Sequence, residues 1–270
     1  MFRTKVSQFI RSLGLLYQMD RINFFIEKVK NRKSNDQFIK DHPSVKLPPD
    51  YLIFESFQLN YKKYYSESME TSEWIVDSVK PYMSLKNINV LDWGCGPGRV
   101  IRHMYESLDK NCKLYGTDYN LKSINWCQSN LKNIFFNHNG IESNLPFNDN
   151  YFHLIYGISI FTHLSEEKHY EWFDELLRVL SPQGIMFFTT QGDNFRVKLS
   201  ENEKVKYDNG ELVVRGNVKE GHRTFSAFQP KQFMLDLFKD VTIESHLIRK
   251  PNKGKSLPQD VWIIRKKKKS

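Results

Sequence analysis

Three glycines at alternate positions follow a short apolar run, in the segment Val90-Leu91-Asp92-Trp93-Gly94-Cys95-Gly96-Pro97-Gly98-Arg99-Val100. A buried strand that ends in such a turn brings backbone N–H groups and a helix N-terminus close to a ligand, because glycine has no Cβ atom. The G-x-G-x-G spacing differs from the G-x-G-x-x-G pattern of dinucleotide loops. A P-loop also carries a lysine, and this loop has none, which argues against NTP hydrolysis. The pattern therefore predicts a cofactor loop of a different nucleotide type.

A carboxylate stands 20 residues after Gly98, in the sequence Leu114-Tyr115-Gly116-Thr117-Asp118-Tyr119. At the end of a strand, Asp118 can accept hydrogen bonds from both hydroxyls of a ribose. An aspartate in this position also commonly caps the next helix. The two roles are compatible, and the distance from the glycine loop favours ribose binding.

The segment from Asp92 to Gly98 resembles motif I of the class I S-adenosylmethionine-dependent methyltransferases, an acidic residue followed by x-G-x-G-x-G. Residues 145–156 and 172–184 resemble two further stretches of that family, the second being its E-x-x-R-V-L-x-P-G-G helix end. The resemblance is strong over residues 71–192. It implies S-adenosylmethionine as cofactor and S-adenosylhomocysteine as product. The sequence contains no HExxH helix and no paired-cysteine site, so we expect no metal ion.

The same resemblance assigns roles around the cofactor. It places Asp92 near the α-amino group of the methionine half and Tyr119 against the adenine, while Asn139 stands where relatives often have an acidic residue. The cofactor-binding residues that it implies are Asp92, Gly94, Cys95, Gly96, Gly98, Asp118, Tyr119, Asn139 and Gly140.

His163 is the candidate catalytic residue. It follows a predicted strand at 152–156, and open α/β folds bind their substrates at the carboxyl edge of the sheet. A near-neutral imidazole there can take the proton of an acceptor hydroxyl as the methyl group arrives. The same histidine can instead cap or pack the following helix without acting as a base, and the sequence leaves both roles open.

Alternating strands and helices position these residues from Ile88 onward. The last two strands are joined by a loop too short for a helical crossover, so they must pair antiparallel. The sequence predicts an α/β fold with a doubly wound, mostly parallel seven-stranded sheet, an antiparallel carboxyl-terminal hairpin strand and an N-terminal helical extension. The predicted strands are 88–92, 113–117, 134–137, 152–156, 184–190, 241–248 and 261–265, and the predicted helices are 99–107, 121–131, 166–180 and 230–238.

We expect a helical extension or cap over residues 1–70 and a Rossmann-like domain over 71–270. Apolar residues at helical spacing within residues 4–32 predict a helix or helix pair. Its apolar face can pack on the catalytic domain, on a second subunit or at a membrane interface. Further predictions are a proline-rich connector at 42–50, helices at 51–65 and 71–83, a variable insert at about 193–229 that roofs the acceptor pocket, and a basic tail at 265–270.

Charge is concentrated at one end of the chain. The formal net charge is +9, yet residues 249–270 hold nine Lys/Arg and one acid, which leaves the preceding 248 residues at about +1. A nearly neutral body argues against a nucleic-acid groove. The tail is either a solvated end or a weak contact for anionic lipid or polyanions.

Cysteine usage and hydropathy bear on location. Cys95, Cys112 and Cys127 lack metal-type spacing, and a disulfide at Cys95 would obstruct the glycine loop, so a reducing cytoplasm fits. No apolar run near the start reaches the roughly 20 residues of a membrane span. We expect a cytoplasmic protein, with peripheral contact at the inner face of the membrane as the alternative.

These observations predict methyl transfer to an oxygen or nitrogen of a small-molecule or sugar acceptor. The extended amino-terminal region followed by this core is similar to methyltransferases of bacterial surface-glycan pathways. Two alternatives remain at this level: a non-catalytic, methyltransferase-like partner subunit, and an RNA or protein methyltransferase anchored by the basic tail. The sequence does not fix the oligomeric state.

Overall fold

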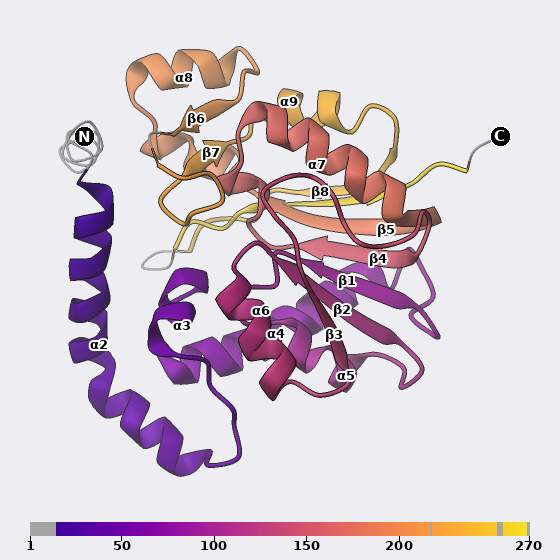
Figure 1. Cartoon of the computed structure of the whole chain (residues 1–270). Coiled ribbons are helices and arrows are strands. Elements are labelled where there is room, and N and C mark those ends of the chain that lie inside the picture. Colours follow the sequence, from indigo (N-terminus) through magenta and orange to yellow (C-terminus); the bar gives the residue numbers. More distant parts are fainter. Residues whose placement is uncertain (1–14, 217, 253–255, 269–270) are drawn as a thin grey trace. The chain divides into compact units, whose positions relative to one another are not determined.

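The computed structural model describes residues 15–216, 218–252 and 256–268. The chain divides into two compact units (Figure 1). The amino-terminal unit spans residues 16–139, and the carboxyl-terminal unit comprises residues 140–270 together with 1–15. Over the described ranges, no helix is long and apolar enough to cross a membrane.

The amino-terminal unit joins helices to a parallel three-stranded segment. In β1, β2 and β3, Asp92 lies opposite Gly116, and Gly116 lies opposite Phe136. β1 is buried almost throughout, as expected for a strand with both faces covered. The elements are α2 (Leu16–Asp41), α3 (Asp50–Ser56), α4 (Tyr61–Val79), β1 (Asn89–Trp93), the 3₁₀ turn η1 (Ile101–His103), α5 (Met104–Ser107), β2 (Lys113–Asp118), α6 (Leu121–Asn130) and β3 (Ile134–His138).

Three predicted helices of this unit differ from the structure. The predicted helix 51–65 is broken after α3, because the Asn60 side chain accepts the Lys63 backbone N–H at 3.0 Å and caps a new helix. That helix, α4, runs to Val79 and absorbs most of the predicted helix 71–83. The predicted helix 99–107 is only the turn η1 followed by the single helical turn α5.

The carboxyl-terminal unit contains the antiparallel strand that the sequence predicts. β4 and β5 are parallel, whereas β9 runs antiparallel to both β5 and β8. β6 and β7 form a separate two-stranded sheet. The elements are β4 (Phe152–Gly157), η2 (Phe161–His163), α7 (Glu166–Val179), β5 (Leu180–Thr190), η3 (Asp193–Lys198), α8 (Glu201–Asp208), β6 (Val213–Arg215), β7 (Ser226–Phe228), α9 (Lys231–Leu237), β8 (Thr242–Leu247) and β9 (Asp260–Arg265).

Over the described residues the main sheet has seven strands, in the order β3-β2-β1-β4-β5-β9-β8. The predicted fold class is therefore confirmed. β5 begins four residues earlier than predicted, because Leu180 already pairs with Phe152 of β4 before the register shifts between Phe152 and Leu154. The division into residues 1–70 and 71–270 remains a prediction.

The insert predicted at 193–229 is ordered over its described residues. η3, α8, β6 and β7 enclose a small core of their own, made of Phe195, Leu199, Tyr207, Val213 and Phe228. Arg215 of β6 binds Glu203 of α8 through Nε at 2.8 Å and Nη2 at 2.7 Å. The insert is thus a small folded module.

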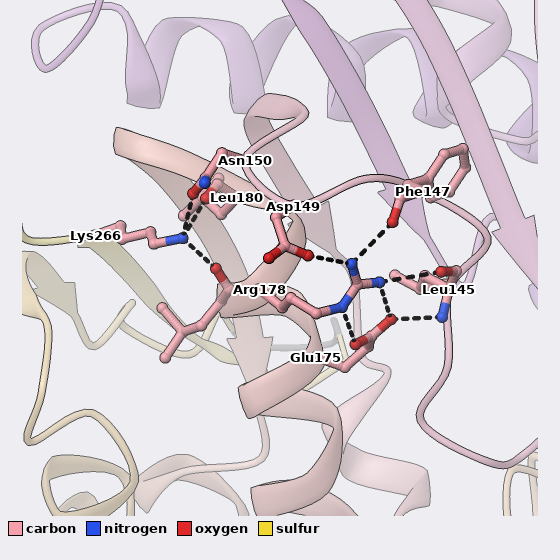
Figure 2. Close-up of polar contacts among 9 residues, drawn as sticks. Leu145, Phe147, Asp149, Asn150, Glu175, Arg178, Leu180 and Lys266 are labelled. Atoms are coloured by element: carbon pink, nitrogen blue, oxygen red, sulfur yellow. Dashed lines mark hydrogen bonds and ion pairs between the residues drawn. The ribbon is translucent and has the colours of Figure 1, made fainter.

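Arg178 at the end of α7 holds the loop that leads into β4 (Figure 2). Its guanidinium donates to the Leu145 carbonyl at 3.1 Å, to the Phe147 carbonyl at 2.9 Å and to the Asp149 carboxylate at 2.7 Å. It also forms a two-point pair with Glu175, which in turn accepts the Leu145 backbone N–H at 2.6 Å. One planar group therefore fixes both ends of the loop against the helix.

We expect Arg178→Ala to lower the free energy of unfolding by about 2 kcal/mol, because Glu175 and two carbonyls lose their partner. Arg196→Ala is the matched control. Arg196 also makes two bonds to a carboxylate, that of Asp208, but both side chains are exposed (43% and 49%). Its loss should cost less than about 1 kcal/mol. Urea unfolding checks both values, and equal effects would contradict the role of Arg178.

Candidate functional site

The glycine loop after β1 has the conformation that its sequence predicts. Gly94, Gly96 and Gly98 have φ angles of 76°, 53° and 70°, the left-handed region that side chains disfavour. The backbone N–H groups of Gly94 and Cys95 both donate to the Thr117 carbonyl of β2, at 2.8 and 2.9 Å. The loop is therefore folded back against the end of the neighbouring strand.

Asp118, the last residue of β2, joins this loop to the start of α6. Its Oδ2 accepts the Gly96 N–H at 2.8 Å, and its Oδ1 accepts the Asn120 N–H at 2.7 Å. The cap of α6 is Asn120, whose side chain accepts from the backbone of Lys122 and Ser123. Asp118 therefore does not cap the helix. Each of its oxygens keeps a further lone pair for a ligand.

Burial raises the pKa of Asp118 to about 6, and only 7% of the residue is exposed. The hydrogen bonds from Asn120 and Gly96 lower the pKa, while the nearby Glu55 carboxylate raises it. Since two backbone donors do not fully offset the loss of hydration, the free carboxylate is under-solvated. Additional hydroxyl donors, such as those of a ribose, would stabilise its ionised form.

The other predicted cofactor residues of this unit surround the loop. Asp92 is buried in β1 (4% exposed), and the Asn139 backbone N–H donates to the Asp118 carbonyl at 3.2 Å. Tyr119 directly follows Asp118 and is half-buried. Burial raises the pKa of the Cys95 thiol well above its usual value, and its Sγ would lie 2.9 Å from a Cβ atom added at Gly116. The Cys95 side chain is therefore packing, and only its backbone is available to a ligand.

Three residues that sequence reasoning missed support the loop from α3 and α4. The Tyr64 hydroxyl donates to the Pro97 carbonyl at 3.4 Å, and Ser56 Cβ would lie 3.3 Å from a Cβ added at Gly96. The Asn120 side chain donates to Glu55 at 2.8 Å. These residues lie at least 33 positions from their partners, in a segment without a motif, so no sequence signal pointed to them.

Arg99, which directly follows the glycine loop, contacts the same segment. Its Nη1 donates to the Ser68 hydroxyl of α4 at 3.2 Å, and its guanidinium lies 4.6 Å from the centre of the Phe57 ring. These contacts favour a structural role for Arg99.

The amino-terminal unit fits a nucleoside cofactor without phosphates. Any side chain at Gly96 would crowd Ser56, and the left-handed backbone there is strained for a residue that has a Cβ atom. The loop therefore presents backbone without side-chain atoms at this position. The carboxylate of Asp118 adds an acceptor for hydroxyls. No lysine or arginine is among the residues that would hold the cofactor, which suits a ligand with a cationic sulfonium.

In the carboxyl-terminal unit, His163 lies at the end of η2, beyond the carboxyl end of β4. Its Nδ1 is 2.8 Å from the Phe225 carbonyl oxygen. Since a carbonyl can only accept, Nδ1 carries the proton and Nε2 of the neutral ring keeps its lone pair. Burial lowers the pKa of His163 below 6.5, with smaller contributions from Arg223 and His222. The imidazole is therefore a neutral base of defined tautomer at pH 7.

The insert reaches the His163 segment at two further points. The Gly221 N–H donates to the His163 carbonyl at 2.9 Å, and the Gln229 side chain donates to the Phe161 carbonyl at 3.0 Å. Gly140, the remaining predicted cofactor residue, lies in this unit. A Cβ added there would find Glu142 N at 3.6 Å, which is ordinary contact.

Comparison with known proteins agrees with this geometry. Residues 90–184 match the family described as a methyltransferase domain. One similar solved structure is a SAM-dependent methyltransferase from Methanosarcina mazei, with a TM-score of 0.54 and 17% identity over 70% of this chain and 97% of that chain. Another is a putative sarcosine dimethylglycine methyltransferase from Galdieria sulphuraria, with a TM-score of 0.54 and 14% identity over 87% of this chain and 98% of that chain.

A third similar structure is the complex between the Haloferax volcanii Trm112 methyltransferase activator and a putative methyltransferase. Its TM-score is 0.51 and its identity is 11%, over 76% of this chain and 93% of that chain. At these identities the structures establish the fold. The matched segment, residues 90–184, is thus similar to a methyltransferase domain, and it lies within a chain that has the Rossmann-like fold of these structures.

No group of three or more His, Cys, Asp or Glu side chains within the described ranges is placed to hold a metal ion. The three cysteines are buried free thiols.

We expect the affinity for S-adenosylhomocysteine to fall as the pH drops through about 6, the value to which burial raises the pKa of Asp118. The ionised carboxylate accepts the ribose hydroxyls, so protonation removes acceptor capacity, by about tenfold per pH unit once the acid form dominates. Asp118→Asn should weaken binding about 10- to 100-fold at pH 7.5 and flatten this pH dependence. Calorimetric titration between pH 5 and 8 measures both. A pH-independent wild type, or a variant that binds equally well, would contradict the ribose role.

Gly98→Ala should lower stability by about 1–2 kcal/mol, because the backbone is left-handed there and the new Cβ would lie 2.5 Å from Leu131 Cδ1. Gly140→Ala is the matched control, because the added methyl group would make only an ordinary contact with Glu142 N at 3.6 Å, and it should change stability by less than about 0.5 kcal/mol. Thermal unfolding midpoints compare the two. A Gly140→Ala variant as unstable as Gly98→Ala would show that the loop glycine has no special constraint.

Proposed function

We propose that this protein is an S-adenosylmethionine-dependent methyltransferase of class I that modifies an oxygen or nitrogen of a small-molecule or sugar acceptor. The observation that carries the proposal is His163, a buried neutral imidazole whose Nδ1–H is directed to the Phe225 carbonyl at 2.8 Å. This arrangement leaves Nε2 as a proton acceptor at the carboxyl end of a parallel strand, where open α/β folds bind substrates.

S-Adenosylmethionine, when bound, supplies an electrophilic methyl group on a positive sulfur. The residues proposed to hold it are Asp92, Gly94, Cys95, Gly96, Gly98, Asp118, Tyr119, Asn139 and Gly140. Asp118 would hold the ribose, and the loop would let the methionine half approach its backbone closely, because its glycines have no Cβ atoms. The lone pair of an acceptor hydroxyl or neutral amine would form the bond to the methyl carbon as the S–CH3 bond breaks and leaves its electron pair on sulfur, and His163 would take the proton that the acceptor oxygen or nitrogen loses. Positioning and exclusion of water supply the rest of the rate enhancement.

The insert at 193–229 is the proposed selector of the acceptor. It contacts the His163 segment through Gly221, Phe225 and Gln229, so its sequence can alter the surroundings of the base. Its aromatic and polar side chains suit a compact acceptor such as a sugar. The near-neutral charge of residues 1–248 also favours such an acceptor over a nucleic acid.

The test is transfer of a radiolabelled methyl group from S-adenosylmethionine to a panel of sugars, nucleotide sugars, small amines, bulk RNA and protein. We expect labelling of a sugar or small molecule, and a drop in kcat of about 100-fold for His163→Asn without a comparable change in cofactor affinity. For the wild type, kcat should stay flat through neutral pH and fall only in acid, below the usual titration range of histidine, because burial lowers the pKa of His163 and protonation removes the base.

Labelling of RNA or protein alone would overturn the proposed acceptor class. A His163→Asn variant with unchanged kcat would reduce His163 to a packing role. Cofactor binding without transfer to any acceptor would favour a partner subunit.

A further inference from the structure

Helix α2 is anchored in the amino-terminal unit by one face. The ring of Phe24 packs 5.5 Å from that of Phe54, centre to centre, and Phe38 is 4% exposed. Asn35 donates to the Leu59 carbonyl at 3.4 Å and accepts the Tyr61 N–H at 2.9 Å. The orientation of the helix within this unit is therefore fixed by both apolar and polar contacts.

The opposite face of α2 carries an apolar stripe that these contacts leave exposed. Met19, Ile22, Ile26 and Val29 are spaced by three, four and three residues, which places them on one side of a helix, and Phe25 adjoins them. At 100° per residue, Ile22 and Ile26 lie roughly 160° around the helix from Phe24. The exposed fractions are 38% for Met19, 51% for Ile22, 58% for Phe25, 54% for Ile26 and 76% for Val29.

Positive charge surrounds this stripe. All five cations between residues 16 and 33 are exposed, namely Arg21, Lys28, Lys30, Arg32 and Lys33. Three of them lie beside carboxylates: Lys28 is 2.9 Å from Asp50, Lys30 is 3.0 Å from Glu27, and Arg32 is 4.0 Å from Asp36. The two acids of the same segment are withdrawn from solvent: Asp20 is 8% exposed, and Glu27 is half-buried beside Asn31 and Lys30. The exposed side of the helix is thus apolar along its centre and cationic at its margins.

An apolar stripe with cationic margins favours an anionic membrane over a second copy of α2 as the partner of this helix face. A second copy of α2 packed on the stripe would bring the cationic margins of both helices together without exposed acids from residues 16–33 to oppose them. A bilayer with anionic lipids accepts both parts, the apolar side chains at the acyl boundary and the cations at the headgroups. From Met19 to Val29 the stripe is only about 15 Å long, which suits a helix lying in the plane of the interface.

We propose that α2 attaches the protein to the surface of anionic phospholipid membranes through Met19, Ile22, Phe25, Ile26 and Val29. The flanking cations add attraction that depends on ionic strength. This attachment is a property separate from methyl transfer and does not depend on the acceptor.

The test is co-sedimentation of the full chain with vesicles of phosphatidylcholine, either alone or mixed equally with phosphatidylglycerol. We expect at least tenfold stronger partitioning to the anionic vesicles, weakened when NaCl is raised from about 0.05 to 0.5 M. The double variant Ile22→Gln, Ile26→Gln keeps good helix formers and should reduce partitioning at least tenfold. Val205→Gln on α8, where Val205 is 62% exposed, is the matched control and should bind as the wild type does.

Circular dichroism and the thermal midpoint verify that each variant is folded, which is expected because the substituted side chains are exposed. Three results would overturn the proposal. They are absence of wild-type binding to anionic vesicles, equal loss in the Val205→Gln control, and a concentration-dependent dimer, seen by analytical ultracentrifugation, that the double variant abolishes.

Discussion

The hydrogen bonds to the Asp118 carboxylate hold together the region that is proposed to bind the cofactor. By accepting the N–H groups of Gly96 and Asn120, it connects the loop after β1, the end of β2 and the start of α6. Each of these backbone donors would otherwise need another partner in a buried place. The same side chain is left under-hydrated, as its raised pKa shows. The Asp118 carboxylate therefore both supports the loop and can accept hydrogen bonds from a ligand that has hydroxyl groups.

Much of this arrangement could be predicted from local sequence. Gly94, Gly96 and Gly98 mark three alternate left-handed positions, and the apolar runs on either side mark the strands. The antiparallel β9 followed from the shortness of the loop before it. Local patterns did not reveal Tyr64 or Glu55, because contacts between distant segments leave no periodicity in the chain. The break between α3 and α4 was missed because the cap at Asn60 lies inside a run of helix-compatible residues.

In the carboxyl-terminal unit, a motif that resembles a family pattern has a structural role. The segment Glu175–Arg178 lies within the helix that resembles the methyltransferase family, and in the structure it organises the approach to β4. His163, by contrast, is bound through Nδ1 to a carbonyl of the insert, whose sequence no motif describes. The tautomer of the candidate base is therefore set by a carbonyl of the insert. Under the proposal that the insert selects the acceptor, a change of acceptor and a change in the basicity of His163 are linked through the same segment.

The position of β9 between β5 and β8 also determines the order in which these strands can pair while the chain is synthesised. β5 ends at Thr190, and the strand that pairs with its free edge begins 70 residues later, at Asp260. On the ribosome, that edge of β5 has no β9 to pair with until residues 260–265 emerge, and an unpaired edge invites wrong partners. β8 is likewise made before its neighbour, although the short loop lets the β8–β9 pair close quickly once both exist. The carboxyl-terminal unit is thus completed late, by insertion of its last strand into the sheet.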